Sequence, residues 1–238
     1  LYLHQDTHPS AVVFRIAVIS CSDPTGAGEP VKLNSPAAHM CVDQYGSFRL
    51  TDAIRPAPDH GITPRQGYRI DTYHDVAAGV NVPVLAAAIS REGLFDLFLA
   101  LLEPLGEEVD VILETSHKSR KGAHRDLYRE DIDLPVLLSH FCDFEDLLLN
   151  DGCTGIAVVS KDQPMELQFD EHKLLVVYAR TLGPAEAVLR RAGIRRDDHL
   201  KLISEGEHLH LTDPRYQAEF EDMALRISVD QRTGQVSW

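Results

Sequence analysis

The sequence predicts an α/β or α+β fold with a mixed β-sheet and flanking helices. The clearest support is the stretch 141–180, where a helical segment precedes three strand-like runs. Runs 155–159 and 174–178 are apolar on both faces, as strands covered on each side are. Between them, residues 165–169 alternate apolar and polar side chains, which is typical of a strand with one face in water. A helix followed by three strands is therefore the centre of the predicted core.

The N-terminal region, residues 1–80, has a different composition. Eight of the thirteen prolines fall in the first 90 residues, and turn-forming residues separate short strand-like runs at 14–19, 47–50 and 67–73. We expect this region to be irregular and rich in short strands, and to pack on a core that begins at residue 81.

The core is predicted to start with a strand, a helix and a second strand. Residues 82–89 form a buried apolar run, and Ser90 can cap the helix that follows. Apolar residues then recur at helical spacing, and Gly106 ends the helix before the apolar run 109–113. Because a strand, a helix and a strand within about thirty residues match a right-handed crossover unit, we expect these two strands to be parallel.

After this unit the sequence indicates a polar loop and a second helical region. The loop covers 115–133 and has no apolar periodicity, whereas 134–151 is helical in pattern. Asp143 is a good N-cap within that region, since its carboxylate can accept hydrogen bonds from backbone amides, and Gly152 can end the helix.

The C-terminal part is predicted to contain two helices and several short strands. One helix begins at 183 with a proline in its first turn and ends at Gly193. Short strands are expected at 200–203 and 208–211, followed by a helix that starts at Asp213 and Pro214. The tail, 226–238, has the pattern of a hairpin.

Composition and charge exclude several classes of protein. The net charge of −14 argues against general nucleic-acid binding, because the phosphate backbone would be repelled. No apolar run approaches the roughly 20 residues that span a bilayer. Four cysteines do not make a disulfide framework, and no basic, apolar leader is visible. We therefore expect a reduced, cytoplasmic protein, with a leader removed before Leu1 as the open alternative.

The polar loop is the first candidate site, because it follows a buried strand and contains four cations in an otherwise acidic chain. These candidate anion ligands are Lys118, Arg120, Lys121 and Arg125. They could hold a phosphate or carboxylate. His117 and His124 could transfer protons beside Glu114 at the end of the strand, so these three residues are the candidate catalytic groups. A solvated loop with no ligand is the alternative interpretation.

The second candidate is a metal site at His208 and His210. On a strand, residues i and i+2 face the same way, so both imidazoles could bind one divalent ion such as Zn²⁺. Asp213 and His199 could complete the ligand set. Two exposed histidines opposite an apolar face would produce the same pattern.

Two functional hypotheses follow. The first is a noncatalytic binding or interaction domain for a small anionic ligand or a protein partner, since no specific catalytic motif is present. The second is a hydrolase-like enzyme that acts on a small anionic substrate through the 114–126 loop, with or without a bound metal. Fold class alone does not decide between them.

Overall fold

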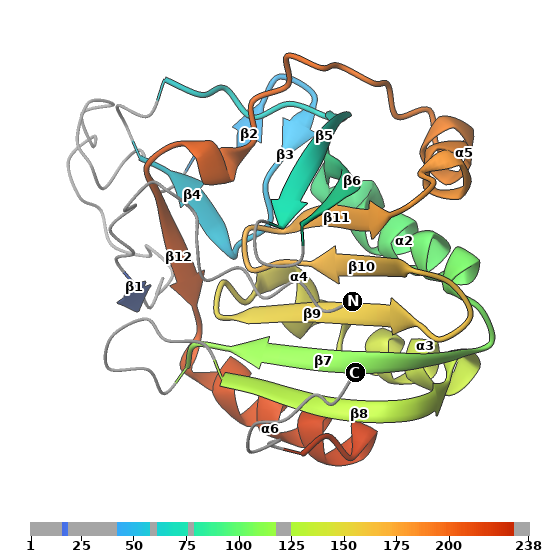
Figure 1. The fold of residues 1–238 in the computed structure, drawn as a ribbon. Helices are drawn as coiled ribbons and strands as arrows, with labels where there is room; N and C mark the ends of the chain where they lie inside the picture. Colours follow the sequence, from blue (N-terminus) through green and yellow to red (C-terminus); the bar gives the residue numbers. More distant parts are fainter. Residues whose placement is uncertain (1–15, 19–41, 58–60, 76–78, 118–124, 231–238) are drawn as a thin grey trace.

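The fold is built on a seven-stranded antiparallel sheet with helices on one face (Figure 1). The computed structural model describes residues 16–18, 42–57, 61–75, 79–117 and 125–230. In sheet order, the strands are β5 (Gly67–Asp75), β6 (Val80–Ala88), β11 (Leu174–Ala179), β10 (Met165–Phe169), β9 (Thr154–Ser160), β7 (Glu108–Thr115) and β8 (Arg125–Asp133). Each neighbouring pair is antiparallel. The predicted combination of a β-sheet with flanking helices is thus confirmed in its α+β form, with a large sheet that is antiparallel throughout rather than mixed.

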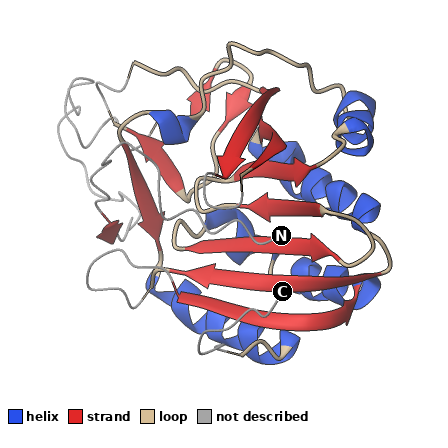
Figure 2. Cartoon of the chain, in the orientation of Figure 1, coloured by secondary structure: helices blue, strands red, loops and turns tan. Residues whose placement is uncertain are grey.

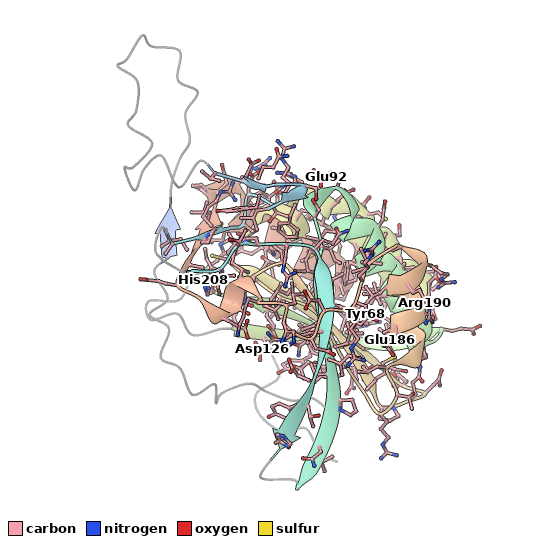
Figure 3. The ribbon with its side chains drawn as sticks, turned by 90° about the horizontal axis from the view of Figure 1, so that it is seen from above. Tyr68, Glu92, Asp126, Glu186, Arg190 and His208 are labelled. Atoms are coloured by element: carbon pink, nitrogen blue, oxygen red, sulfur yellow. The ribbon has the colours of Figure 1, made fainter. Side chains whose placement is uncertain are left out.

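Helices α2, α3, α4 and α6 lie behind the sheet in the view of Figure 1, and Figure 2 shows the same separation of strands and helices. The helices are α2 (Arg91–Leu102), α3 (Leu134–Asp143), α4 (Glu145–Asn150), α5 (Gly183–Arg191) and α6 (Pro214–Ile227), with 3₁₀ turns at η1 (Glu103–Leu105) and η2 (Ile203–Glu205). α5 is attached to the edge strand β5 through Tyr68, whose hydroxyl donates to Glu186 at 3.1 Å (Figure 3).

A smaller sheet lies beside the large one. Its order is β1 (Ile16–Val18), β12 (His208–Thr212) and β4 (Ile54–Pro56), and a short hairpin is formed by β2 (Gln44–Tyr45) and β3 (Phe48–Arg49). The sequence region 1–80 therefore contributes short strands, as expected. It also contributes β5, so the large sheet begins at Gly67 rather than at residue 81.

The predicted crossover unit is present, with one difference. β6 and β7 run in the same direction, because four antiparallel steps separate them in the sheet. They are not neighbours, since the hairpin strands β10 and β11 and the strand β9 lie between them. The three strands predicted at 155–178 thus complete the centre of the sheet as a meander.

Several predicted elements were wrong in detail. The region 134–151 divides into α3 and α4 at Phe144, and Asp143 ends α3 instead of capping a helix. The end of the predicted loop 115–133 is strand β8. These residues were missed because β8 is mostly acidic and basic at an edge of the sheet, where solvent accepts charged side chains.

Two further corrections concern the C-terminal part. Residues 200–203 are not a strand, and the 3₁₀ turn η2 begins at Ile203. α6 begins after Asp213 as predicted but continues to Ile227, so the tail does not start as a hairpin strand. The predicted turn at 233–234 lies outside the described residues.

Side chains on the two faces of the large sheet pack in different apolar clusters. The larger cluster lies between the sheet and the helices and contains fully buried Phe98, Phe141 and Leu167. Leu148 and Val158, which the sequence places in the core, are also there and are at most 1% exposed. The smaller cluster covers the opposite face at one end of the sheet, where Ala86, Ala88 and Leu174 meet residues of β3, β4 and the segment 200–203. The rest of that face lies outside this cluster.

Candidate functional site

Three histidines from two distant segments, two of them buried and one half-buried, form a cluster at one end of the large sheet. His208 and His210 share one side of β12, and His172 lies in the turn between β10 and β11. The three ring centroids are 4.8, 4.8 and 5.0 Å apart. One ring nitrogen from each lies within 4.8 Å of the other two. His208 and His210 thus lie close together, and the third member of the cluster is His172 and not the predicted Asp213.

Backbone carbonyls orient the two rings on β12. The Nδ1 atom of His208 lies 2.7 Å from the carbonyl oxygen of Gly206, and Nδ1 of His210 lies 2.8 Å from that of Gly152. A carbonyl oxygen only accepts, so Nδ1 must carry the hydrogen in both rings. In the neutral rings Nε2 then holds the lone pair, and both Nε2 atoms are buried. This is the tautomer in which histidine binds a metal through Nε2.

His172 is oriented by a carboxylate in the same manner. Its Nδ1 atom donates to Asp170 Oδ2 at 2.9 Å, and Glu171 Oε1 lies 3.9 Å from the same nitrogen. A carboxylate that accepts from the outer nitrogen of a histidine is a common partner of metal-bound imidazole, because it fixes the ring and raises its basicity.

The three histidines of the cluster have different pKa values. Burial opposes a charge on His172, but Asp170 and Glu171 raise its pKa to about 9. Burial, and then the positive charge on His172, lower the pKa of His208 and bring that of His210 to about 3. One imidazolium therefore lies between two neutral imidazoles, and a metal ion would take the place of its proton.

The ring spacing suits a single ion. A zinc ion bound at about 2.1 Å from a ring nitrogen lies about 3.2 Å from the ring centroid, so three imidazoles at tetrahedral angles have centroids about 5 Å apart. The observed 4.8–5.0 Å agrees with this arrangement.

Gly152 allows the close approach that places its carbonyl against His210. Its amide donates to the Leu211 carbonyl at 2.8 Å, and a Cβ at this position would lie 2.3 Å from the carbonyl oxygen of Ala53. Only glycine fits between these two backbones. Sequence reasoning assigned Gly152 to the end of a helix, and its contact with β12 could not be predicted from local pattern.

Asp151, next in the chain, is the centre of a second buried group. It is fully buried and accepts from His117 Nε2 at 2.8 Å, from Thr154 Oγ1 at 2.5 Å and from Thr212 Oγ1 at 2.6 Å. Burial alone would raise the pKa of Asp151, but the contacts with His117, Thr154 and Thr212 together outweigh it and lower the pKa. His117, a predicted catalytic residue, is therefore held by a carboxylate and is 7% exposed.

Cys153 lies beside this pair, with His117, Asp151 and Cys153 offering possible ligand atoms within 4.8 Å of one another. Burial and the charge of Asp151 raise the pKa of the Cys153 thiol. A metal here would have to displace the short contact between His117 and Asp151, so this group fits a metal less well than the three-histidine cluster.

The other predicted ligands have different roles. The Asp213 carboxylate accepts from the Arg215 amide at 2.9 Å and caps α6. The backbone amide of His199 donates to Asp197 Oδ1 at 2.9 Å. His199 belongs to none of the groups that could hold a metal among the described residues. Neither residue joins the histidine cluster.

The predicted loop site is described only in part. Glu114 pairs with Gly155 across β7 and β9, and a Cβ on Gly155 would lie 3.2 Å from Glu114 Oε2. Arg125 is the first residue of β8 and is half-buried. The remaining loop residues lie outside the described part of the chain: Lys118, Arg120, Lys121 and His124. The anion site therefore stays a prediction.

No protein-family model matches this sequence, and neither the curated proteins nor the solved structures contain a significant match. Across the described residues, every helix is too short or too polar to cross a membrane. The assignment of function therefore depends on the geometry of the site.

Proposed function

We propose that this protein binds a divalent transition-metal ion of the zinc class through His172, His208 and His210. The observation that carries the proposal is the proximity of two buried imidazoles and one half-buried imidazole, each with Nδ1 bonded to an oxygen atom. Neutral imidazole suits zinc, copper, nickel and iron, whereas magnesium and calcium prefer oxygen ligands. The function is then that of a metal-binding domain, noncatalytic as in the first sequence hypothesis but with a metal ion in place of an anionic ligand or a protein partner.

Cobalt and zinc titrations of chelator-treated protein test this function. We expect one ion per chain and a Co²⁺ absorption spectrum of low coordination number. His210→Asn should lower the affinity at least about tenfold, the range seen when metal-ligand shells are disturbed. Asparagine retains a donor near the position of Nδ1, so the bond to the Gly152 carbonyl can persist while Nε2 is lost.

The matched control is His199→Asn, which changes an exposed histidine outside the cluster. It should bind metal like the wild type. Equal metal stoichiometry and affinity in the wild type, His172→Asn and His210→Asn would show that these histidines do not bind the metal. Circular dichroism of each variant separates loss of metal from loss of fold.

A metal-assisted hydrolase is the second candidate, and the pocket that includes His172 favours it. This pocket has a space of about 20 Å³ for the centre of a water molecule, enough for about one water. Its described lining has no acidic residue and contains the cationic side chains Arg49, Arg65, Lys173 and Lys201. A water bound to a three-histidine metal becomes a nucleophile near neutral pH, and these cations suit an anionic substrate.

One assay distinguishes the metal-binding domain from the metal-assisted hydrolase. A hydrolase loaded with zinc should cleave an activated anionic ester, such as p-nitrophenyl phosphate, and His210→Asn should lose that activity together with the metal. A binding domain would take up the same metal in the titration and show no turnover.

A further inference from the structure

The sheet face that points away from the helices contains a hollow at the end far from the histidine cluster. It lies over β6, β9, β10 and β11 and the turn 161–164, and its volume is about 440 Å³. Sites for small organic ligands commonly measure about 300–1,000 Å³. Glu166 lines this hollow near the start of β10, whereas His172 follows the end of the same strand, so the two sites are separate.

The alternation of side chains along the strands decides which residues line the hollow. Glu166 pairs with Val159 on β9 and with Tyr178 on β11, so these three side chains share one face of the sheet. Val82 of β6 also lines the hollow. The walls are mainly apolar, and Glu166 supplies a carboxyl group among them.

The Glu166 carboxyl is the unusual feature of this hollow. The residue is 2% exposed, and its Oε1 atom accepts from Gln168 Nε2 at 2.6 Å. Its Oε2 atom is buried without a hydrogen-bond partner among the described residues. Burial raises the pKa of Glu166 to about 7, although the bond from Gln168 opposes this. A buried carboxylate without a second partner is unfavourable, and a cationic ligand would remove that cost.

Among the described residues, the cations at the rim of the hollow do not neutralise Glu166. Lys161 lies at the rim but is bonded to Asp131, with Asp110 at 3.8 Å. Arg180 also lines the hollow, and neither Lys161 nor Arg180 is among the charges that shift the pKa of Glu166. A positive ligand group at Oε2 is therefore favoured over a negative one.

We propose that this hollow binds a small organic cation, an amine with an apolar body whose ammonium group donates to Glu166 Oε2. The apolar body would contact Val82, Val159 and Tyr178. Nothing in this proposal depends on the metal site. A structural alternative is a carboxyl that stays protonated and binds nothing.

Benzylamine is the probe, with benzyl alcohol and benzoate as neutral and anionic analogues of similar shape. Binding is followed by amide chemical shifts of the isotope-labelled full chain, at a pH above the Glu166 pKa of about 7. We expect benzylamine to bind about tenfold more tightly than either analogue, the ratio that corresponds to a hydrogen bond with a charged group. The shifts should be centred on Val82, Glu166 and Tyr178.

Glu166→Gln should reduce benzylamine affinity about tenfold while it leaves benzyl alcohol unchanged. The matched control is Asp162→Asn, which removes a carboxylate from the rim of the same hollow and should have less than about a twofold effect. Three results would overturn the proposal: equal binding of the three probes, equal affinity in Glu166→Gln and wild type, or shifts that map elsewhere or are absent. If Glu166→Gln does not fold, the comparison of the three probes on the wild type still decides.

Discussion

The two faces of the large sheet are made by alternate residues of the same strands, yet they are covered in different ways. On β9 and β10, Val158 and Leu167 point to the helices and are fully buried, whereas Val159 and Glu166 point to the opposite face. Helices cover the first face with a continuous apolar cluster. The second face is covered at one end by the smaller cluster and has the hollow beside Glu166 at the other.

This difference shows how one sheet can be stabilised on one side and carry polar chemistry on the other. Apolar burial behind the sheet supplies most of the stability. A single buried carboxyl on the other side is tolerated because the helix-covered face does not depend on it.

Phe98→Ala should have the largest effect, because it opens a cavity on the helix-covered face. Phe98 is fully buried, and its ring centroid lies 5.3 Å from that of Phe141 and 4.9 Å from that of Phe169. We expect a loss of about 3–5 kcal/mol in the free energy of unfolding. Urea denaturation measures it, and a loss below about 1 kcal/mol would mean that this cluster is not the principal core.

Glu166 should make stability depend on pH. Its pKa is about 7 in the folded protein against an ordinary value of 4.5, because burial disfavours the charged form. The folded state then holds the proton more tightly than the unfolded chain. The contribution of Glu166 is complete below about pH 4.5 and is lost as the pH rises through 7. At about 1.4 kcal/mol per pH unit, the loss is about 3 kcal/mol.

The measurement is urea denaturation of wild type and Glu166→Gln between pH 4 and 8. The variant should gain stability relative to the wild type as the pH rises. Glu145→Gln, at an exposed position on α4, is the control. A constant difference between wild type and Glu166→Gln across this range would show that the carboxyl is solvated.

The smallest effects come from neighbouring residues on opposite faces of β9. Val158→Ala removes two methyl groups from a fully buried site and should cost about 2 kcal/mol. Val159→Ala changes a half-buried residue at the wall of the hollow and should cost less than about 1 kcal/mol. Thermal and urea denaturation of both variants compare the faces directly, and equal losses would contradict the proposed difference in covering.

Much of the fold was predictable, because the patterns involved are local. The meander β9, β10 and β11 follows from apolar runs separated by turns, and α2 and α5 follow from helical periodicity and glycine ends. The edge strand β8 was not predictable, because its polar residues have no clear alternation. The pairing of β5 with β6 was also missed, since a proline-rich sequence region surrounds the first of these strands.

Two of the three ligands in the candidate metal site could be predicted from the sequence. His208 and His210 follow from the two-residue period of a strand, which depends only on adjacent positions. His172 lies 36 positions before His208, and its own surroundings indicate only a polar turn. Asp213 was chosen because it is near in sequence, and it caps a helix instead.

Local sequence patterns account for most of the helices, the central strands and the side of β12 on which two histidines lie, because backbone geometry and apolar spacing act over a few residues. Tertiary structure alone decided which elements meet. The segment before β9 meets β12 because Gly152 lets the two backbones come into contact, and the turn between β10 and β11 places His172 beside the other two histidines. Tertiary structure also decided which residues surround Glu166, because the segments that cover a face of the sheet are distant from it in the chain.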